Sequence, residues 1–227
     1  GKIFHEGSPV EAFDVVGQHR RDFGPRPDER VAYTPPPGLN TSTDWGAYPE
    51  SNEDMPDWQN AQWVIEQLNE QHDKPFFLSV GFVRPHVPWF VPQEWFDLHP
   101  LENIFLPLNK ENQLENLPET SRRFAHLPQM PQMEWMKQEQ RWEKSVQAYL
   151  ASTTFVDHCV GMVIDALQNS SYAENTIIIL WSDHGYHLGE KGIWAKHTLW
   201  ERSTSAPLII LKPDQISPAV VHKPVNH

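Results

Sequence analysis

The stretch WSDHGYHLGEKGIWAKHTLWERSTSAP, residues 181–207, decides the fold class, because it joins a strand pattern to a cluster of polar residues. The apolar run 176–181 leads into it, and Asp183 and His184 follow that run almost at once. A hydrophobic strand that ends in a carboxylate, an imidazole and a glycine is typical of α/β enzymes, which place ligands at the carboxyl ends of strands. We therefore expect the chemistry of this protein at such a sheet edge.

Helix and strand patterns alternate outward from this stretch. Helices are expected at about residues 57–71 and 143–168, because apolar residues recur there at spacings of three and four. The continuous apolar runs 75–82, 176–181 and 207–211 are typical of short strands buried on both faces. This alternation predicts an α/β fold, with a mostly parallel sheet and flanking helices.

Proline-rich segments separate these elements. Residues 7–54 show no helical or strand period and are expected to form a long surface excursion. The segment RPHVPWFVPQEWFDLHP, residues 84–100, follows the first expected strand, and its four prolines predict irregular structure. Residues 100–136 are also expected to form loops. The two motif-rich loops, after residues 82 and 181, both leave strands at their carboxyl ends and are expected at the same sheet edge.

Composition narrows the function classes. The chain has 227 residues and a formal net charge of −12, which argues against a nucleic-acid binder, because phosphate backbones require a basic surface. A single cysteine, Cys159, excludes an internal disulfide and a multi-cysteine metal site. The sequence contains no run of about 18 apolar residues, so that no membrane span is predicted. The opening GKIFHEG is not a targeting signal.

Asp183 and His184 are the candidate metal ligands. A carboxylate oxygen suits Ca²⁺, Mg²⁺ or Mn²⁺, and a mixed nitrogen and oxygen site also suits Zn²⁺. Two protein ligands do not close a site. The alternative is structural, with Asp183 capping a turn and His184 packed beside it.

Four further residues in the interior of the chain are candidates for catalysis or substrate binding. Lys196 and the adjacent His197 lie among large apolar residues, where a lysine either snorkels to the surface or binds an anion in a cleft. His86 is flanked by Pro85 and Pro88, which suits a general acid on a rigid loop as well as a structural histidine. Arg84 offers a fork of donors to an oxyanion. The remaining candidates are the chain-start pair Lys2 and His5.

Four motifs, taken together, resemble the sulfatases of the alkaline phosphatase superfamily, and most closely the iduronate-2-sulfatase-like branch. They occur in the order of that family: GKIFH at 1–5, KPFFLSVGFVRPHVP at 74–88, YLASTTFVDHCVG at 149–161 and SDHGYHLGEKGIWAKHTLWERSTSAPLII at 182–210. The resemblance implies an alkaline-phosphatase-like catalytic domain. Residues 1–227 would form a central to C-terminal part of that one domain.

The resemblance also implies a set of roles. Asp183 and His184 would bind a divalent cation, which is usually calcium in this family, with Mg and Mn as alternatives. Lys196 would contact the sulfate, and His86 would protonate the leaving alcohol. The other implied roles are catalytic for Lys2 and His5, which would border the sulfate and the nucleophile, and substrate-binding for Arg84 and His197.

Two features of the family's active site are absent from the printed sequence. Sulfatases use a formylglycine made from Cys or Ser in a Cys/Ser-x-Pro-x-Arg motif, and no such motif occurs here. The paired aspartates that complete the family's metal site are also absent. We therefore expect the chain to be a piece of a longer enzyme and to be inactive alone. The resemblance further implies a protein that is exported or lysosomal.

Three functions remain open at this point. The first is a sulfuric ester hydrolase that acts on a sulfated small molecule or glycan. The second is a phosphodiester or phosphonate monoester hydrolase of the same superfamily. The third is a noncatalytic relative that binds anionic glycans. The sequence predicts neither the particular ester nor the oligomeric state.

Overall fold

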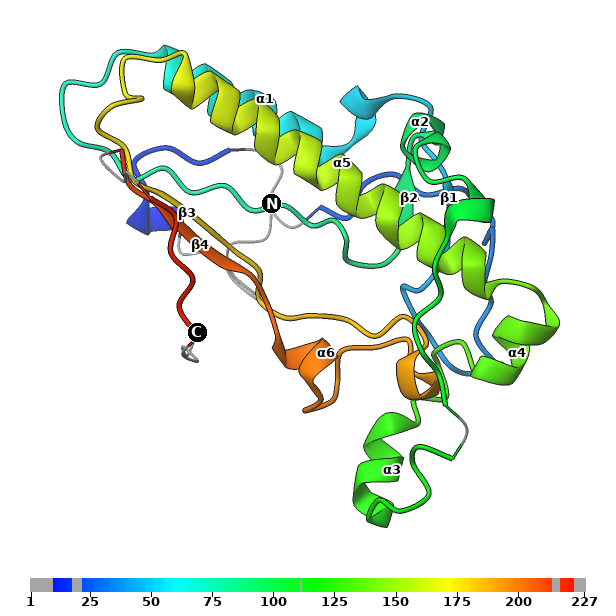
Figure 1. The fold of residues 1–227 in the computed structure, drawn as a ribbon. Coiled ribbons are helices and arrows are strands. Elements are labelled where there is room, and N and C mark those ends of the chain that lie inside the picture. The colour runs from blue at the N-terminus through cyan, green and yellow to red at the C-terminus, as the bar shows by residue number, and fades with distance from the viewer. Residues whose placement is uncertain (1–9, 18–21, 111, 214–216, 223–227) are drawn as a thin grey trace.

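The computed structural model describes residues 10–17, 22–110, 112–213 and 217–222, in which helices and short strands are joined by long irregular segments (Figure 1). In chain order the elements are η1 (Val10–Ala12), β1 (Trp45–Ala47), η2 (Asn52–Asp54), α1 (Pro56–Asn69), β2 (Trp89–Val91), α2 (Gln93–Asp97), η3 (Leu101–Asn103), α3 (Glu119–Ala125), α4 (Met133–Gln138), α5 (Trp142–Gln168), β3 (Ile178–Trp181), η4 (Glu190–Gly192), α6 (Glu201–Thr204) and β4 (Leu208–Leu211).

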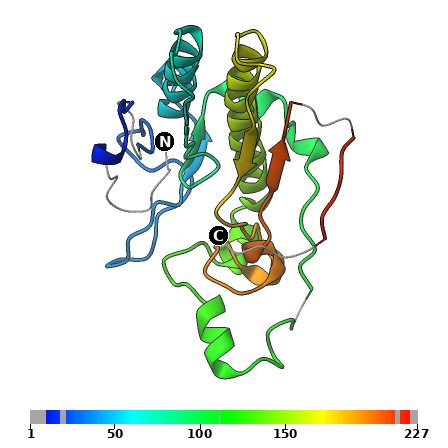
Figure 2. The same cartoon turned by 90° about the vertical axis from the view of Figure 1, so that its left-hand side faces the viewer.

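The two long helices were predicted correctly, and they pack side by side (Figures 1 and 2). On α1, Ala61, Val64 and Leu68 recur at helical spacing and are buried. On α5, the small side chains Ala148 and Ala151 are buried and have the spacing that lets a neighbouring element approach closely. The paired helices form the side of the molecule on which the polar loops are mounted.

Helix α5 is long and apolar enough, by length and composition alone, to cross a membrane. In the structure it packs against α1, α2 and β2, and its buried side chains include Phe155 and Cys159. One face of the helix therefore belongs to the core. The central core also includes the fully buried rings of Trp89 and Trp194.

A short parallel pair, β1 with β2, overturns the prediction that residues 84–100 are irregular. Trp45 is paired with Trp89, and the register continues to Ala47 and Val91. The prolines of this segment flank the strand instead of occupying it, so that the strand keeps the N–H groups required for pairing. The helix α2 follows directly, which the prolines also did not prevent.

The two apolar runs nearest the C-terminus form β3 and β4, which pair in antiparallel register from Ile178 with Leu211 to Trp181 with Leu208. The described part of the chain therefore holds one parallel and one antiparallel pair in place of the single, mostly parallel sheet that was expected. All four side chains of β4 are exposed, and so are most of those of β3, although buried strands were predicted.

Residues 75–82, the first expected strand, have no paired neighbour in the described residues. Phe76, Leu78 and Val80 pack against Leu68 and Leu167 at the far ends of α1 and α5, whereas Phe77 is 82% exposed. The strand prediction was therefore wrong, because the apolar run buries one face only and finds no ladder.

The predicted loop regions are partly correct. The long excursion carries only η1, β1 and η2 over its described part, as the absence of a periodic pattern indicated. Residues 100–136 were expected to be loops, and instead they hold η3, α3 and the beginning of α4. The class of the fold, helices combined with small sheets, agrees with the α/β prediction.

Candidate active site on the loops after β3 and before β2

The polar loop after β3 folds back on the chain that returns to β4. Three backbone bonds join the two sides: the N–H groups of Ser182, Gly185 and His187 donate to the carbonyls of Pro207, Ser203 and Ala195 at 3.1, 2.8 and 3.0 Å. Residues 182–207 therefore form one compact unit. The fold brings Asp183 and His184 into the same unit as Lys196.

Gly185 is required at the tightest point of this unit. A Cβ on Gly185 would lie 2.0 Å from the carbonyl oxygen of Arg202 and 2.8 Å from that of Ser205. Both neighbours are backbone atoms, so neither can move aside as the end of a flexible side chain does. The glycine therefore lets the Asp183–His184 turn lie directly on the turn of α6.

Asp183 and His184 lie as neighbours at the end of β3. Oδ1 of Asp183 is 3.6 Å from Nε2 of His184, and the side chains are 54% and 30% exposed. Nδ1 of His184 donates a hydrogen bond to the carbonyl oxygen of Gly185 at 2.8 Å. In the neutral ring Nε2 then carries the lone pair, so that a nitrogen and a carboxylate oxygen converge.

This donor set fits one side of a divalent-cation site. One carboxylate oxygen and one imidazole nitrogen, tied by a backbone carbonyl, are ordinary ligands. No group of three or more His, Cys, Asp or Glu residues that could hold a metal occurs in the described ranges. The described part of the chain therefore offers two ligands for such an ion.

Lys196 and His197 follow a buried segment, Ile193 to Ala195. Lys196 is half-buried and His197 is exposed. The carbonyl of Lys196 accepts a hydrogen bond from the N–H of Thr198 at 2.8 Å, which tightens the turn that carries both residues. Its intermediate exposure is that of a partly sheltered cation, as an anion site requires.

The loop before β2 carries His86. Its N–H donates to the carbonyl of Val83 at 2.8 Å, and Nδ1 lies 2.7 Å from the carbonyl oxygen of Val87. The ring packs edge-on against Phe23, with the centroids 5.1 Å apart. These contacts fix the imidazole and, because a carbonyl only accepts, assign Nδ1 as the donor to the backbone.

Arg84 has a different role from the predicted one. The side chain is 4% exposed, and its guanidinium donates to the carbonyl oxygens of Phe90 at 3.1 Å and Phe23 at 2.9 Å. Burial lowers the pKa of Arg84 to about 10, so that the side chain stays cationic near neutral pH. The prediction that Arg84 binds substrate is corrected: its donors hold the loop.

Trp89 joins the His86 loop to the Asp183–His184 loop. Its indole nitrogen donates to the carbonyl of Pro85 at 2.8 Å, next to His86. Its ring packs edge-on against Tyr186 with the centroids 5.7 Å apart, two residues after His184. The two loops were expected at one sheet edge. They instead meet through aromatic packing over α5.

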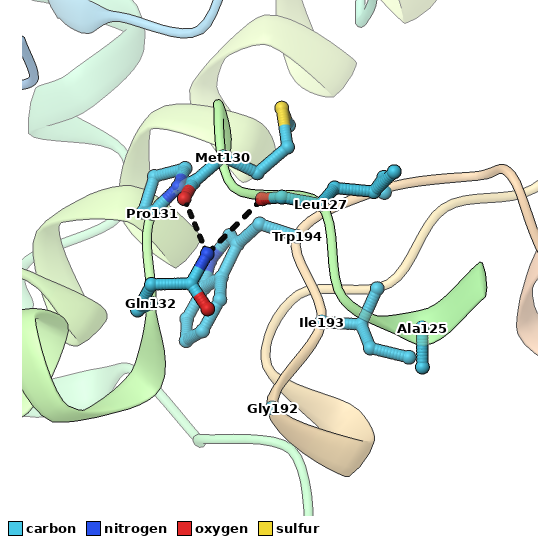
Figure 3. Close-up of a pocket in the computed structure, with 9 residues that line it drawn as sticks. Ala125, Leu127, Met130, Pro131, Gln132, Gly192, Ile193 and Trp194 are labelled. Atoms are coloured by element: carbon cyan, nitrogen blue, oxygen red, sulfur yellow. Dashed lines mark hydrogen bonds between the residues drawn. The ribbon is translucent and has the colours of Figure 1, made fainter. Parts of the chain in front are cut away.

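A small hollow lies beside residues 192–195, the segment that precedes Lys196 in the chain (Figure 3). It lies between the α3–α4 connection and residues 192–195 and has room for about one water molecule. Gln132 closes it by donating to the carbonyls of Leu127 at 3.1 Å and Met130 at 2.8 Å. The hollow is too small for a substrate.

Lys2 and His5, the remaining predicted site residues, lie outside the described residues. Sequence reasoning missed Asp57, which contacts the His86 loop from α1. Glu190 is tied into the polar loop: its carboxylate accepts from the N–H of Leu188 at 2.8 Å and lies 3.3 Å from Nε of Arg202.

Residues 19–227 match the protein-family model described as Sulfatase, which spans most of the chain. The chain belongs to the sulfatase family. This sulfatase chain is 47% identical over 237 residues to a protein named sulfatase from Formosa agariphila, a match that covers 100% of the chain and 46% of that protein. It is 34% identical over 180 residues to human iduronate 2-sulfatase, covering 70% of the chain and 31% of the human protein. The chain therefore spans less than half the length of these relatives.

Solved structures share the fold. A putative sulfatase from Bacteroides fragilis matches with a TM-score of 0.52 and 26% identity, over 72% of this chain and 32% of that one. The phosphonate monoester hydrolase of Agrobacterium radiobacter matches with a TM-score of 0.60 and 23% identity, over 74% and 35%. The alkaline-phosphatase-like fold predicted from the motifs is thereby confirmed.

Sulfatases use a divalent metal and a formylglycine nucleophile. The metal fits the Asp183–His184 pair, whereas no residue of the printed sequence fits the formylglycine. The single cysteine, Cys159, is buried inside α5, and burial raises the pKa of its thiol. Cys159 therefore does not fit the role of the formylglycine precursor.

The sulfatase chain is expected to lose stability in mild acid because of His187. This ring is 1% exposed, and its burial lowers its pKa from the usual value of about 6.5. The unfolded chain therefore takes up this proton more readily than the folded chain. The free energy of unfolding falls as the pH decreases below about 6.5, toward and through the lowered pKa.

Urea unfolding followed from pH 7.5 to 5 measures this loss. His187→Gln is expected to flatten the pH dependence, because the titrating ring is gone. The control is His126→Gln, which removes an exposed histidine and should keep the wild-type slope. Equal slopes in all three proteins contradict the assignment.

Proposed function

We propose that this chain forms part of the active site of a sulfuric ester hydrolase whose substrate is a sulfated carbohydrate. The observation that carries the proposal is the Asp183–His184 pair, with Nε2 of His184 set 3.6 Å from the Asp183 carboxylate at the end of β3. The pair lies in one compact unit with Lys196 and is linked through Tyr186 and Trp89 to the loop of His86.

Asp183 and His184 would hold the divalent cation, with Ca²⁺ preferred and Mg²⁺ or Mn²⁺ as alternatives. When bound, such an ion polarises the sulfuryl oxygens and offsets their negative charge. The tie from Nδ1 of His184 to the Gly185 carbonyl fixes the ring for this task at 2.8 Å. The Asp183 side chain is 54% exposed, so a cation can reach its carboxylate from solvent.

Lys196 would bind the sulfate oxygens as a compact positive charge, with His197 beside it as a second donor. Lys2 and His5 would complete the anion site from the chain start, a role that follows from the motif GKIFH alone. A net charge of −12 does not oppose this, because the field in a cleft is set by the nearest charges.

His86 would act as general acid. With Nδ1 held by the Val87 carbonyl at 2.7 Å, the imidazolium presents its other proton at Nε2. Transfer of that proton to the ester oxygen lets the alcohol leave neutral instead of as an alkoxide. The nucleophile of the reaction would be the formylglycine of the family, whose motif does not occur in the printed sequence.

Substrate and location rest on the relatives. Human iduronate 2-sulfatase is named for a sugar substrate, and the chain shares 34% of its residues with it over 180 positions. This supports a sulfated sugar in preference to an aryl sulfate. An exported or lysosomal protein is proposed on the same family resemblance, with no nucleic-acid partner and no membrane span.

The test compares two esters that differ in the atom attacked. The full-length protein is incubated with matched aryl sulfate and aryl phosphonate monoesters, and the rates of release are measured. We expect the sulfate ester to be cleaved with the higher kcat/KM. Preference for the phosphonate ester would assign the site to phosphonate hydrolysis, and glycan binding without any cleavage would assign it to a binding protein.

The cation site is tested separately by Asp183→Asn. Loss of the carboxylate charge removes one of the two described ligands, so Ca²⁺ affinity should fall by roughly 10–100-fold or more. Isothermal titration of the full-length protein with CaCl₂ measures this change. The matched control is Asp157→Asn, on an exposed face of α5, which should bind Ca²⁺ as the wild type does. Equal affinities for both variants contradict the site.

A further inference from the structure

Asp57 is a buried carboxylate that the sequence alone places at the start of a helix. It lies at the second position of α1 and is 2% exposed. The N-cap residue of this helix is Met55, so Asp57 does not occupy the cap position. A carboxylate is costly to bury unless both of its oxygens are hydrogen-bonded. The partners of these oxygens therefore indicate what the residue does.

Both oxygens of Asp57 are used on one loop. Oδ1 accepts the N–H of Val83 at 2.8 Å, and Oδ2 accepts the N–H of Arg84 at 2.8 Å. These are consecutive peptide groups, two and three positions before His86. The carboxylate therefore fixes the orientation of the backbone from which the His86 loop begins.

Arg84 closes the loop from its other end. Its buried guanidinium donates from Nε to the carbonyl of Phe90, on β2, and from a terminal nitrogen to the carbonyl of Phe23. Burial raises the pKa of Asp57 and lowers that of Arg84, and the attraction between the two charges offsets part of this cost. The Asp57 carboxylate thus holds the start of the loop, and the Arg84 guanidinium holds its end.

The same guanidinium reaches the packing partner of His86. Phe23, whose carbonyl accepts from Arg84 at 2.9 Å, places its ring edge-on against the His86 imidazole at 5.1 Å. Asp57 and Arg84 therefore act on the His86 loop from two sides: Asp57 through the backbone at residues 83–84, and Arg84 through Phe23.

A second buried carboxylate shows what a purely structural clamp looks like in this chain. Asp44 is 6% exposed and accepts the N–H groups of Val31, Ala32 and Tyr33 at 3.0, 2.7 and 3.1 Å. The loop that it holds carries none of the proposed site residues. The two carboxylates share their chemistry and differ in the loop they serve.

We propose that Asp57 and Arg84 form a buried positioning pair that sets the His86 imidazole for proton transfer. Neither residue touches the substrate. Their role rests on the proposed function of His86 as general acid, whereas the clamp itself is a property of the fold and can be measured without turnover.

The clamp is tested by Asp57→Asn and its matched control Asp44→Asn, in the full-length protein, by amide hydrogen exchange and by NMR of the His86 ring. The amide introduced by Asp57→Asn keeps one acceptor and turns donors toward the second N–H. We expect exchange at Val83 and Arg84 to accelerate by about 10–100-fold, the range for a lost hydrogen bond to a charged group, and the His86 ring signals to shift. Asp44→Asn should leave both readouts at their wild-type values.

A catalytic readout separates positioning from general destabilisation. Asp57→Asn should lower kcat, with little change in KM, more for an alkyl sulfate than for a nitrophenyl sulfate, because only the poor leaving group needs the proton. Arg84→Lys, which keeps the charge but loses the fork, should show the same pattern and serves if Asp57→Asn does not fold.

Wild-type exchange and ring signals in Asp57→Asn, or equal effects of Asp57→Asn and Asp44→Asn, overturn the proposal. A wild-type protein that cleaves no ester refutes the proposed function instead, and the exchange and ring measurements then still decide whether the clamp exists.

Discussion

Gly185→Ala is expected to be the most damaging single substitution in the polar loop. The added Cβ would meet the carbonyl oxygens of Arg202 and Ser205 at 2.0 and 2.8 Å, so the Asp183–His184 turn must separate from α6. The hydrogen bond from the Gly185 N–H to the Ser203 carbonyl, 2.8 Å long, would be lost as well. Overpacking against backbone costs about 3 kcal/mol, and the cation affinity should fall with it.

Denaturant unfolding and CaCl₂ titration measure these two effects. The control is Gly161→Ala: this glycine lies within α5, and a Cβ there meets nothing within 4 Å. Alanine at that position should stabilise the protein by about 0.5–1 kcal/mol, since glycine disfavours the helix. Wild-type stability and cation affinity in Gly185→Ala contradict the description of the loop.

His86→Gln is expected to give the largest loss of activity. Glutamine has no proton of suitable acidity for the leaving alcohol, so kcat on an alkyl or sugar sulfate should fall by about 10²–10⁴-fold. A nitrophenyl sulfate, whose leaving group departs without a proton, should lose much less. The dependence on the leaving group is the signature of a general acid.

Steady-state kinetics of the full-length protein on both substrates measure this difference. His126→Gln, which removes an exposed histidine at the end of α3, is the matched control and should keep wild-type rates on both. An equal loss on the two substrates would show that His86 binds or supports, and does not donate the proton.

The helices were predictable because their signal is local. Ala61, Val64 and Leu68 repeat at helical spacing within one turn or two of each other, and this periodicity requires no knowledge of the rest of the chain. The small buried residues of α5 follow the same rule.

The sheets were less predictable, because pairing is not local. The run at residues 75–82 looks like a buried strand but finds no partner among the described residues, while Trp89–Val91 pairs with Trp45–Ala47, 44 positions earlier. Apolar residues such as Ile179, Trp181 and Ile209 are 52%, 53% and 55% exposed on the β3–β4 pair, against the burial that their pattern indicates. An apolar sequence shows that a strand favours burial, but it does not show which other element would cover it.

The site divides in the same way. Asp183 and His184 were found from a strand end and two adjacent ligand types, which are local features. The role of Arg84 was missed, because its partners Phe23, Phe90 and Asp57 are separated from it in sequence and its charge alone suggested an anion. Asp57 left no signal of its own, since an acidic residue in the first turn of a helix is common.

Release of inorganic sulfate from a carbohydrate sulfate by the full-length protein, with and without a divalent cation, tests the central claim most directly. We expect release to stop when the cation is removed by a chelator, to resume when Ca²⁺ is returned, and to be nearly absent in Asp183→Asn. Sulfate release that persists through chelation and through Asp183→Asn would contradict the account.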